Sequence, residues 1–352
     1  MINTSKNKLY SLQILRAYAA ILVVISHVWN NGILPGTFNE LGGFGVDLFF
    51  VISGFIMCLT VSLNKSKPEN SKKFLQRRII RIFPIYIIIN IPLLLLSIKT
   101  DGVKEPYFYI GNLLLLPSFT NAKDYYLVLG PGWSLVYEMF FYYVFATIML
   151  FTKSKKRLIY SLVALLFLSV AVVRLLRLQG PQLSLVNFSY IIGDTILFNF
   201  AFGMILYLIY ERFNGKTIFN IWQSLGLLLL LTFFGACLIY LKMPRIFSNG
   251  VISLLIVYVF IFTHNFNLED NQLLKHAVFI GDASYSIYLT HFYFQYFKED
   301  FYNMASPLQL DRNVMVNTIG ILSVFLAVLS GILFYVFVEK NIIRFLKTRM
   351  NN

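Results

Sequence analysis

The sequence predicts an all-α protein, a polytopic transmembrane helical bundle of about ten helices with both termini cytoplasmic. Of the 352 residues, 58% are hydrophobic and only 13% are charged, whereas a soluble globular protein has roughly 45–50% apolar and 25% charged residues. The mean hydropathy is +0.69, and such an apolar excess needs lipid as its solvent. The 35 Phe and 22 Tyr residues suit the lipid-facing surface and the headgroup belt.

Ten stretches of the chain are long and apolar enough to be membrane-spanning helices. A helix needs about 20 mostly apolar residues to cross the bilayer core. The first stretch carries Arg16 and His27, so we interpret it as a retained helix rather than a signal peptide. The ninth is the least hydrophobic and is also compatible with a re-entrant segment. The stretches are residues 10–29, 43–62, 81–98, 132–151, 158–175, 188–210, 221–241, 247–264, 279–297 and 314–338.

The distribution of Lys and Arg sets the expected orientation. The formal net charge is +14, but the charges lie between apolar stretches, so they indicate topology rather than nucleic-acid binding. With both termini inside, the inside segments hold roughly twice as many Lys and Arg as the outside segments. The densest inside stretches are 65–81, 153–157 and the C-terminal tail. We expect a single transmembrane domain over residues 1–352, with an outside loop at 99–131 and no appended soluble domain.

Ionisable groups inside a span cost at least ~2.5–3.5 kcal/mol each, so the few that are present are candidate functional residues. Arg16 and His27 lie eleven residues apart in the first stretch. On a helix both side chains then share one face, about 16 Å apart along the axis. Arg16 would lie near the inner side and His27 near the outer side. Alternatively, Arg16 reaches the inner headgroups and His27 lies in the outer interface.

Two carboxylates, Asp47 and Glu138, are expected at the same outer depth as His27. Asp47 opens the second stretch between apolar neighbours and therefore needs a partner, whereas Gly54 is more typical of a small-residue packing face. Glu138 lies about two turns into the fourth stretch and shares a helix face with Ser134. A carboxylate beside an imidazole is typical of the base and orienting group of an acyl-transfer site. A proton relay uses the same residue types, and the residues alone do not separate the two.

A dense cationic cluster precedes the third apolar stretch. Its members are Lys72, Lys73, Arg77, Arg78 and Arg81. The positive-inside rule and anionic lipid headgroups explain such a cluster. The alternative is a site for the phosphates of a nucleotide-like donor, for which paired Arg side chains are suited.

The ninth stretch carries polar groups on one face. Ser284, Tyr288 and His291 follow an i, i+4, i+7 spacing, which indicates a helix that could line a cavity. His264 and His276 fall at or near an inner loop, and we interpret them as solvated. No helix shows two His at i and i+4 and no Cys/His cluster appears, so no metal site is expected.

Four sequence elements, in order and at the usual spacing, resemble the acyltransferase-3 family of integral-membrane O-acyltransferases. In the first element Arg16 is followed eleven residues later by His27, and the third carries the family's Arg-x-x-Arg pattern as Arg78 and Arg81. Each element is weak alone, but the set is specific and covers essentially the whole chain. The elements are LQILRAYAAILVVISHVW at 12–29, GVDLFFVISGF at 45–55, RRIIRIFPIY at 77–86 and GWSLVYEMFFY at 132–142, with a softer fifth, SYSIYLTH, at 284–291.

The resemblance implies a multi-pass O-acyltransferase of the bacterial inner (cytoplasmic) membrane. Family members transfer acyl groups, mostly acetyl from acetyl-CoA, to glycans handled at the membrane. The expected acceptor is a surface polysaccharide such as an O-antigen, a capsule or an exopolysaccharide, or its lipid-linked precursor. The resemblance makes His27 the central catalytic residue, with Glu138 and Asp47 in support. The residues that it assigns to the acyl donor are Arg16, Arg78 and Arg81.

Three more residues are expected to support the reaction. Ser134 or Trp133 could donate a hydrogen bond to the developing oxyanion, and His291 could line the site. The expected partners are acyl-CoA, the glycan acceptor and membrane lipids, not nucleic acid; acetyl-CoA is the donor substrate and no metal is expected. A glycan or small-molecule transporter without covalent chemistry is the main alternative, followed by a structural or lipid-interacting protein. The residues leave open whether transfer is direct or proceeds through an acyl-enzyme.

Overall fold

The protein is built from α-helices. The computed structural model describes residues 9–29, 37–119, 125–182, 185–305 and 311–351. Within these ranges the backbone forms helices and two isolated bridges but no strand, which confirms the predicted all-α class. The helical elements are α1 (Tyr10–Val28), α2 (Thr37–Thr60), α3 (Lys67–Asp101), α4 (Pro106–Leu114), α5 (Gly132–Met149), α6 (Lys155–Leu175), α7 (Phe188–Ile191), α8 (Leu197–Arg212), α9 (Ile221–Tyr240), the π-helix η2 (Ile246–Val251), α10 (Ile252–Ile261), α11 (Gln272–Asp282), α12 (Ser284–Tyr296), α13 (Lys298–Ala305), α14 (Arg312–Phe334), the π-helix η4 (Tyr335–Glu339) and α15 (Lys340–Asn351).

Among the described residues, six helices are long and apolar enough to cross a membrane, in agreement with a multi-pass membrane protein. Each of the ten apolar stretches is largely helical in the described part of the chain. The number of spans and the cytoplasmic placement of both termini stay predictions. The six helices are Tyr10–Val28, Glu40–Thr60, Lys67–Asp101, Lys155–Leu175, Ile221–Tyr240 and Asn313–Arg349.

Two of the apolar stretches are interrupted rather than continuous. The stretch 188–210 divides into α7 and α8, and the Asp194 carboxylate accepts a hydrogen bond from the backbone N–H of Ile196 at 3.1 Å just before α8 begins. The stretch 279–297 divides at Ala283 into the end of α11 and the whole of α12. Local hydrogen bonding of this kind sets helix ends that hydropathy does not reveal.

Helix α3 extends well beyond the third apolar stretch, 81–98. It begins at Lys67 with Pro68 in its first turn, a position where the missing N–H of proline removes no helical hydrogen bond. The cationic cluster is therefore helical. Because Arg78 and Arg81 are spaced i, i+3, they project from the same side of α3.

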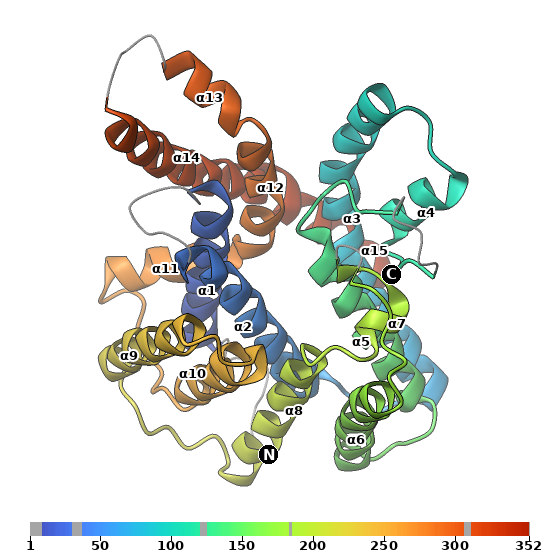
Figure 1. Ribbon diagram of the computed structural model, residues 1–352. Coiled ribbons are helices and arrows are strands. Elements are labelled where there is room, and N and C mark those ends of the chain that lie inside the picture. The colour runs from blue at the N-terminus through green and yellow to red at the C-terminus, as the bar shows by residue number, and fades with distance from the viewer. Residues whose placement is uncertain (1–8, 30–36, 120–124, 183–184, 306–310, 352) are drawn as a thin grey trace.

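The centre of the bundle is formed by α1 and α2 (Figure 1). Helix α2 packs most extensively against α8 and α1. A Cβ atom on Gly54 would lie 2.3 Å from the carbonyl oxygen of Phe200, and one on Gly203 would lie 2.0 Å from that of Val51. These two glycines let the backbones of α2 and α8 touch, as small residues do between membrane helices. The predicted packing role of Gly54 is confirmed.

The remaining helices surround this centre on two sides. In Figure 1, α9, α10 and α11 lie on one side of α1 and α2, and α3, α5 and α6 lie on the other. Helix α12 packs against both α1 and α14, and it also contacts α3. Residues from α1, α2, α3, α5 and α12 can therefore converge on one internal space.

Candidate active site

A wide cationic vestibule leads into a narrow cavity between α1, α2, α3, α5 and α12. The vestibule has a volume of about 790 Å³ and the cavity about 80 Å³. Arg16, Arg78, Arg81 and Tyr285 line both spaces and so mark the neck between them. The structure thus brings together the three arginines that the sequence assigned to the acyl donor. Three exposed cations of α15 also line the vestibule: Lys340, Arg344 and Lys347.

The arginines of the neck have neutral partners. Arg16 Nη1 donates a hydrogen bond to Gln13 Oε1 at 3.1 Å. The guanidinium of Arg78 lies 5.5 Å from the ring centroid of Tyr142, a cation–π arrangement that fixes the group without neutralising it. Neither partner carries a negative charge, and the cations that line the vestibule outnumber its two carboxylates, Asp282 and Glu339. The neck is therefore suited to an anionic ligand.

Glu138 faces the same cavity as the arginines. Its Oε1 accepts hydrogen bonds from Ser53 Oγ at 3.0 Å and from the hydroxyl of Tyr142. Ser134 also lines the cavity, so the predicted common face of Glu138 and Ser134 is confirmed. Glu138 is partly exposed to the cavity, and among the described residues that line the cavity it is the single one with a negative charge.

The depth of Glu138 differs from the expectation. The sequence placed it beside His27, whereas in the structure it lines the cavity together with Arg16, Arg78 and Arg81. The segment just before α5, residues 125–131, is also packed differently from a surface loop. Leu129 and Gly132 are buried, and the amide of Asn112 in α4 binds the carbonyl of Tyr126 at 2.9 Å and the N–H of Val128 at 2.9 Å. The segment folds into the bundle, so α5 does not begin at the surface.

The Ser134 hydroxyl is engaged inside the protein. It lies 2.7 Å from the Tyr288 hydroxyl and 3.1 Å from the Pro131 carbonyl, and Tyr288 is 3.0 Å from the same carbonyl. Each hydroxyl has one proton, so one of the two, Ser134 or Tyr288, donates to the Pro131 carbonyl and the other donates to its neighbouring hydroxyl. Trp133 packs edge-on against Phe50 with ring centroids 6.4 Å apart. Both predicted oxyanion donors are thus held by protein contacts.

The His27 ring is oriented by its own helix. Its Nδ1 lies 2.9 Å from the carbonyl oxygen of Val23, and Ser26 Oγ donates to that carbonyl as well, also at 2.9 Å. Because a carbonyl only accepts, Nδ1 carries the proton, and Nε2 of the neutral ring keeps its lone pair. The carboxylate expected to orient the ring, from Glu138 or Asp47, does not occupy this place. A backbone carbonyl serves instead.

The neighbour of His27 is the other predicted histidine, His291. Their ring centroids are 5.1 Å apart, and His291 is fully buried. Tyr288 lies 5.9 Å from His291 and 6.0 Å from Phe49, centroid to centroid. Tyr288 and Phe49 line the cavity, and neither histidine belongs to its lining. Phe49 and Tyr288 therefore form an aromatic layer at the cavity, and Tyr288 connects this layer to His291.

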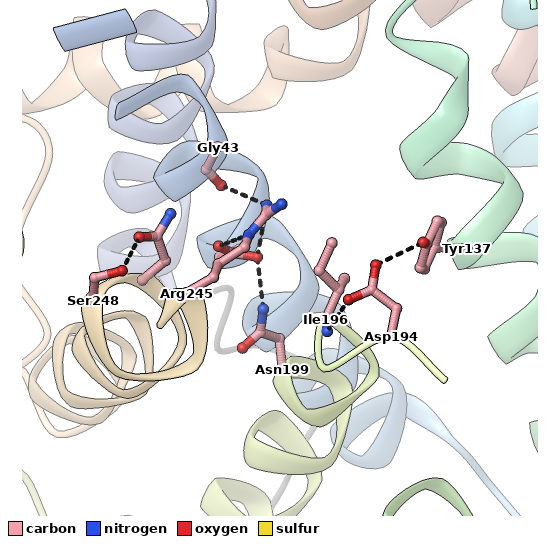
Figure 2. Close-up of polar contacts among 9 residues, drawn as sticks. Gly43, Tyr137, Asp194, Ile196, Asn199, Arg245 and Ser248 are labelled. Carbon is pink, nitrogen blue, oxygen red and sulfur yellow. Dashed lines mark hydrogen bonds and ion pairs between the residues drawn. The ribbon is translucent and has the colours of Figure 1, made fainter. Parts of the chain in front are cut away.

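Asp47 belongs to a separate buried network (Figure 2). Its Oδ2 accepts from Arg245 Nε at 3.0 Å, and its Oδ1 accepts from Arg245 Nη2 at 3.2 Å and from Asn199 Nδ2 at 2.7 Å. Figure 2 also shows Asp194, whose carboxylate accepts a hydrogen bond from the Tyr137 hydroxyl at 2.8 Å. The structure does not bring Asp47 to either of the other predicted catalytic residues. The acid has its partner, but that partner is an arginine outside every matched sequence element.

Several residues of the site were not predicted. Glu339 lines the vestibule, is 6% exposed, and its Oε2 accepts from Ser286 Oγ at 2.5 Å. An acid directly after the tenth apolar stretch was the available signal. Tyr142 follows Glu138 at i+4 and could have been found by helix spacing. Nothing in the sequence pairs Arg245 with Asp47.

Comparison with known proteins identifies the family of the chain. The sequence model of the acyltransferase-3 family, described as an acyltransferase domain, matches residues 9–337. The chain belongs to this family. It is 26% identical over 323 residues to peptidoglycan O-acetyltransferase OatA of Listeria monocytogenes, covering 82% of this chain and 49% of that protein. It is 29% identical over 321 residues to a provisionally named O-acetyltransferase of Staphylococcus aureus, covering 79% and 49%.

A shorter relative aligns over most of both chains. A provisionally named acetyltransferase of Acidianus two-tailed virus is 24% identical over 302 residues, which cover 82% of this chain and 84% of the viral protein. Against the bacterial acyltransferase-3 relatives above, the chain spans about half of their length. No solved structure matches the chain.

Proposed function

We propose that the protein is an acetyl-CoA-dependent O-acetyltransferase of the bacterial inner membrane that acts on a hydroxyl of a cell-surface polysaccharide or its lipid-linked precursor. The arrangement along α1 carries the proposal. Arg16 lines the vestibule and the cavity, and His27, about 16 Å further along the helix, has a ring nitrogen with a free lone pair. Donor and acceptor can thus approach from opposite ends of the bundle.

The shapes of the vestibule and the cavity support CoA as the donor. CoA carries phosphates at one end and the thioester at the tip of a long, thin arm. The vestibule of about 790 Å³ with its Arg and Lys side chains suits the phosphates. The cavity of about 80 Å³ admits only a thin chain. Arg16, Arg78 and Arg81 at the neck would hold the donor where the arm enters.

The chemistry requires one base. His27 Nε2 removes the proton of the acceptor hydroxyl while that oxygen attacks the thioester carbonyl carbon. The tetrahedral intermediate collapses, the C–S bond breaks, and the CoA thiolate takes the proton from His27. The hydrogen bond from Nδ1 to Val23 holds the required tautomer. Phe49 and Tyr288 must move apart before the thioester reaches His27.

A two-step variant uses the same residues. His27 Nε2 attacks the thioester, carries the acyl group and passes it to the acceptor. An acyl-protein adduct that accumulates without acceptor and is lost in His27→Ala would establish the two-step route. Its absence under rapid quenching would favour direct transfer.

The test is the ester-linked acetyl content of purified surface glycan. Cells would carry the intact protein, no protein, His27→Ala or His276→Ala at matched membrane levels. His276 is exposed, so its variant controls for the loss of a histidine. We expect acetyl esters with the intact protein and His276→Ala only. Esters at equal levels in His27→Ala would remove His27 from the mechanism. No ester in any strain, together with altered glycan export, would indicate a transporter.

A further inference from the structure

His291 is a buried polar side chain whose hydrogen-bonding groups are available to a ligand. Its side chain is fully buried, and within the described part of the chain neither ring nitrogen has a hydrogen-bond partner of good geometry. The carbonyls of Ile287 and Tyr288, in its own helix, are the nearest acceptors. A buried polar group without a partner costs stability. Such a group in a native fold calls for a functional explanation.

The location of His291 narrows that explanation. Its ring lies 5.1 Å from the ring of His27, centroid to centroid, at an interplanar angle of 45°. A reacting carbonyl held at His27 Nε2 would therefore lie within reach of His291. The hydroxyls of Ser134 and Tyr288 already bind each other and Pro131. Both His291 ring nitrogens, in contrast, keep their hydrogen-bonding capacity unused in the described part of the chain.

The protonation chemistry of two adjacent imidazoles assigns different roles to them. When His27 takes up the proton of the acceptor, a second positive charge on the neighbouring ring is unfavourable. His291 is then an uncharged imidazole with one N–H to donate. A fixed N–H donor beside a general base, in a site without bulk water, is what stabilises an oxyanion during acyl transfer.

We propose that His291 is a catalytic residue that donates an N–H hydrogen bond to the oxyanion of the tetrahedral intermediate formed at His27. The acceptor oxygen bonds to the thioester carbon, the carbonyl electron pair moves onto the oxygen, and that oxygen accepts the bond from His291. When the pair returns, the C–S bond breaks and the thiolate takes its proton from His27. The inference rests on the proposed function and adds a second imidazole to it.

The experiment compares His291→Gln with His291→Leu. Gln keeps an N–H donor but cannot titrate, whereas Leu keeps neither property. Inner-membrane vesicles that contain the native glycan would receive acetyl-CoA, and thiol release and glycan acetylation would be followed across pH. We expect Leu to lower kcat by about 10²–10³-fold with the KM for acetyl-CoA within about twofold. Gln should retain activity within about tenfold, with the pH profile of the intact protein.

Three outcomes would overturn the inference. Equal loss in Gln and Leu would make His291 a titrating relay, and near-normal activity in Leu would make it structural. If Leu fails to accumulate, His291→Met supplies the apolar variant, and a Met variant as active as Gln also contradicts the inference. Failure of the proposed function is distinguishable, since then the intact protein itself shows no acetyl-CoA-dependent thiol release.

Discussion

Asp47 and Glu138 are two carboxylates inside the bundle that the sequence could not tell apart, and their surroundings differ. Asp47 is fully buried, and both of its oxygens are bound by Arg245 or Asn199. Glu138 is partly exposed to a cavity, and both hydrogen bonds that it accepts fall on Oε1. A buried charge saturated by protein partners holds helices together. A charge with unused capacity beside a cavity is available to a ligand.

The largest effect that this contrast predicts is on stability, in Asp47→Ala. The change leaves Arg245 without its carboxylate, and breaking such a buried pair costs about 3–5 kcal/mol. The folded fraction in membranes and the thermal midpoint in detergent should fall, while kcat per folded molecule stays near normal. The pair Asp47→Leu with Arg245→Leu should recover much of the stability. A hundredfold loss of kcat at unchanged stability would instead restore Asp47 to the catalytic role that the sequence suggested.

The reverse pattern is expected for Glu138→Gln. The amide still accepts hydrogen bonds from Ser53 and Tyr142, so the thermal midpoint should change little. The carboxylate that attracts Arg16 and Arg78 is lost, so the two arginines would be held less firmly for the donor. We therefore expect kcat/KM to fall by about 10²–10³-fold, the scale for one electrostatic contact in an active site. Steady-state rates with acetyl-CoA, at matched protein levels, give the answer. Full activity in this variant would contradict the proposal that Glu138 acts in the reaction whereas Asp47 acts in the fold.

Glu339 combines the two properties that separate Asp47 from Glu138, namely burial with a protein partner and contact with an open space. It is buried and bound by Ser286, yet it lines the vestibule. In Ser286→Ala the carboxylate loses a hydrogen bond, which should cost about 1–3 kcal/mol of stability. If Glu339 acts only in the fold, the KM for acetyl-CoA should not move in this variant. A shift of that KM at equal stability would place Glu339 with the donor site.

The smallest effect is expected at the exposed cations of α15. Replacing Lys340, Arg344 and Lys347 together by Gln should raise the KM for acetyl-CoA by severalfold at low salt and leave kcat unchanged, because exposed charges contribute below about 1 kcal/mol each. The matched control replaces Lys153, Lys156 and Arg157, which are exposed but lie outside the vestibule lining. Equal effects of the two triple variants would show that only total charge matters.

The sequence was sufficient to predict which residues lie together when the periodicity of one helix determines their positions. It placed Arg16 and His27 on one helix, α1, and it gave Glu138 and Ser134 a common face, which both turn to the cavity. The all-α class followed from composition alone. These features depend on residues within a few turns of each other, for which helix geometry is a sufficient guide.

The sequence failed where the geometry depends on contacts between distant helices. Asp47 pairs with Arg245, and His27 lies beside His291, through packing that no local pattern encodes. Glu138 lines the cavity with Arg16, Arg78 and Arg81 rather than binding His27, and the segment just before α5 is buried in the bundle, which hydropathy alone did not predict. Hydropathy reports affinity for lipid and says nothing about which helices meet.

The aromatic layer of Phe49 and Tyr288 has a consequence for the energy metabolism of the cell. A continuous water-filled path through the bundle would conduct protons and ions, and each elementary charge crossing 100 mV dissipates ~2.3 kcal/mol. Phe49 and Tyr288 line the cavity and pack against each other, and Tyr288 also contacts His291, which is not part of the cavity lining. In a membrane that carries an ion gradient, closely packed rings at this place would oppose the passage of water and ions until the reacting groups separate them.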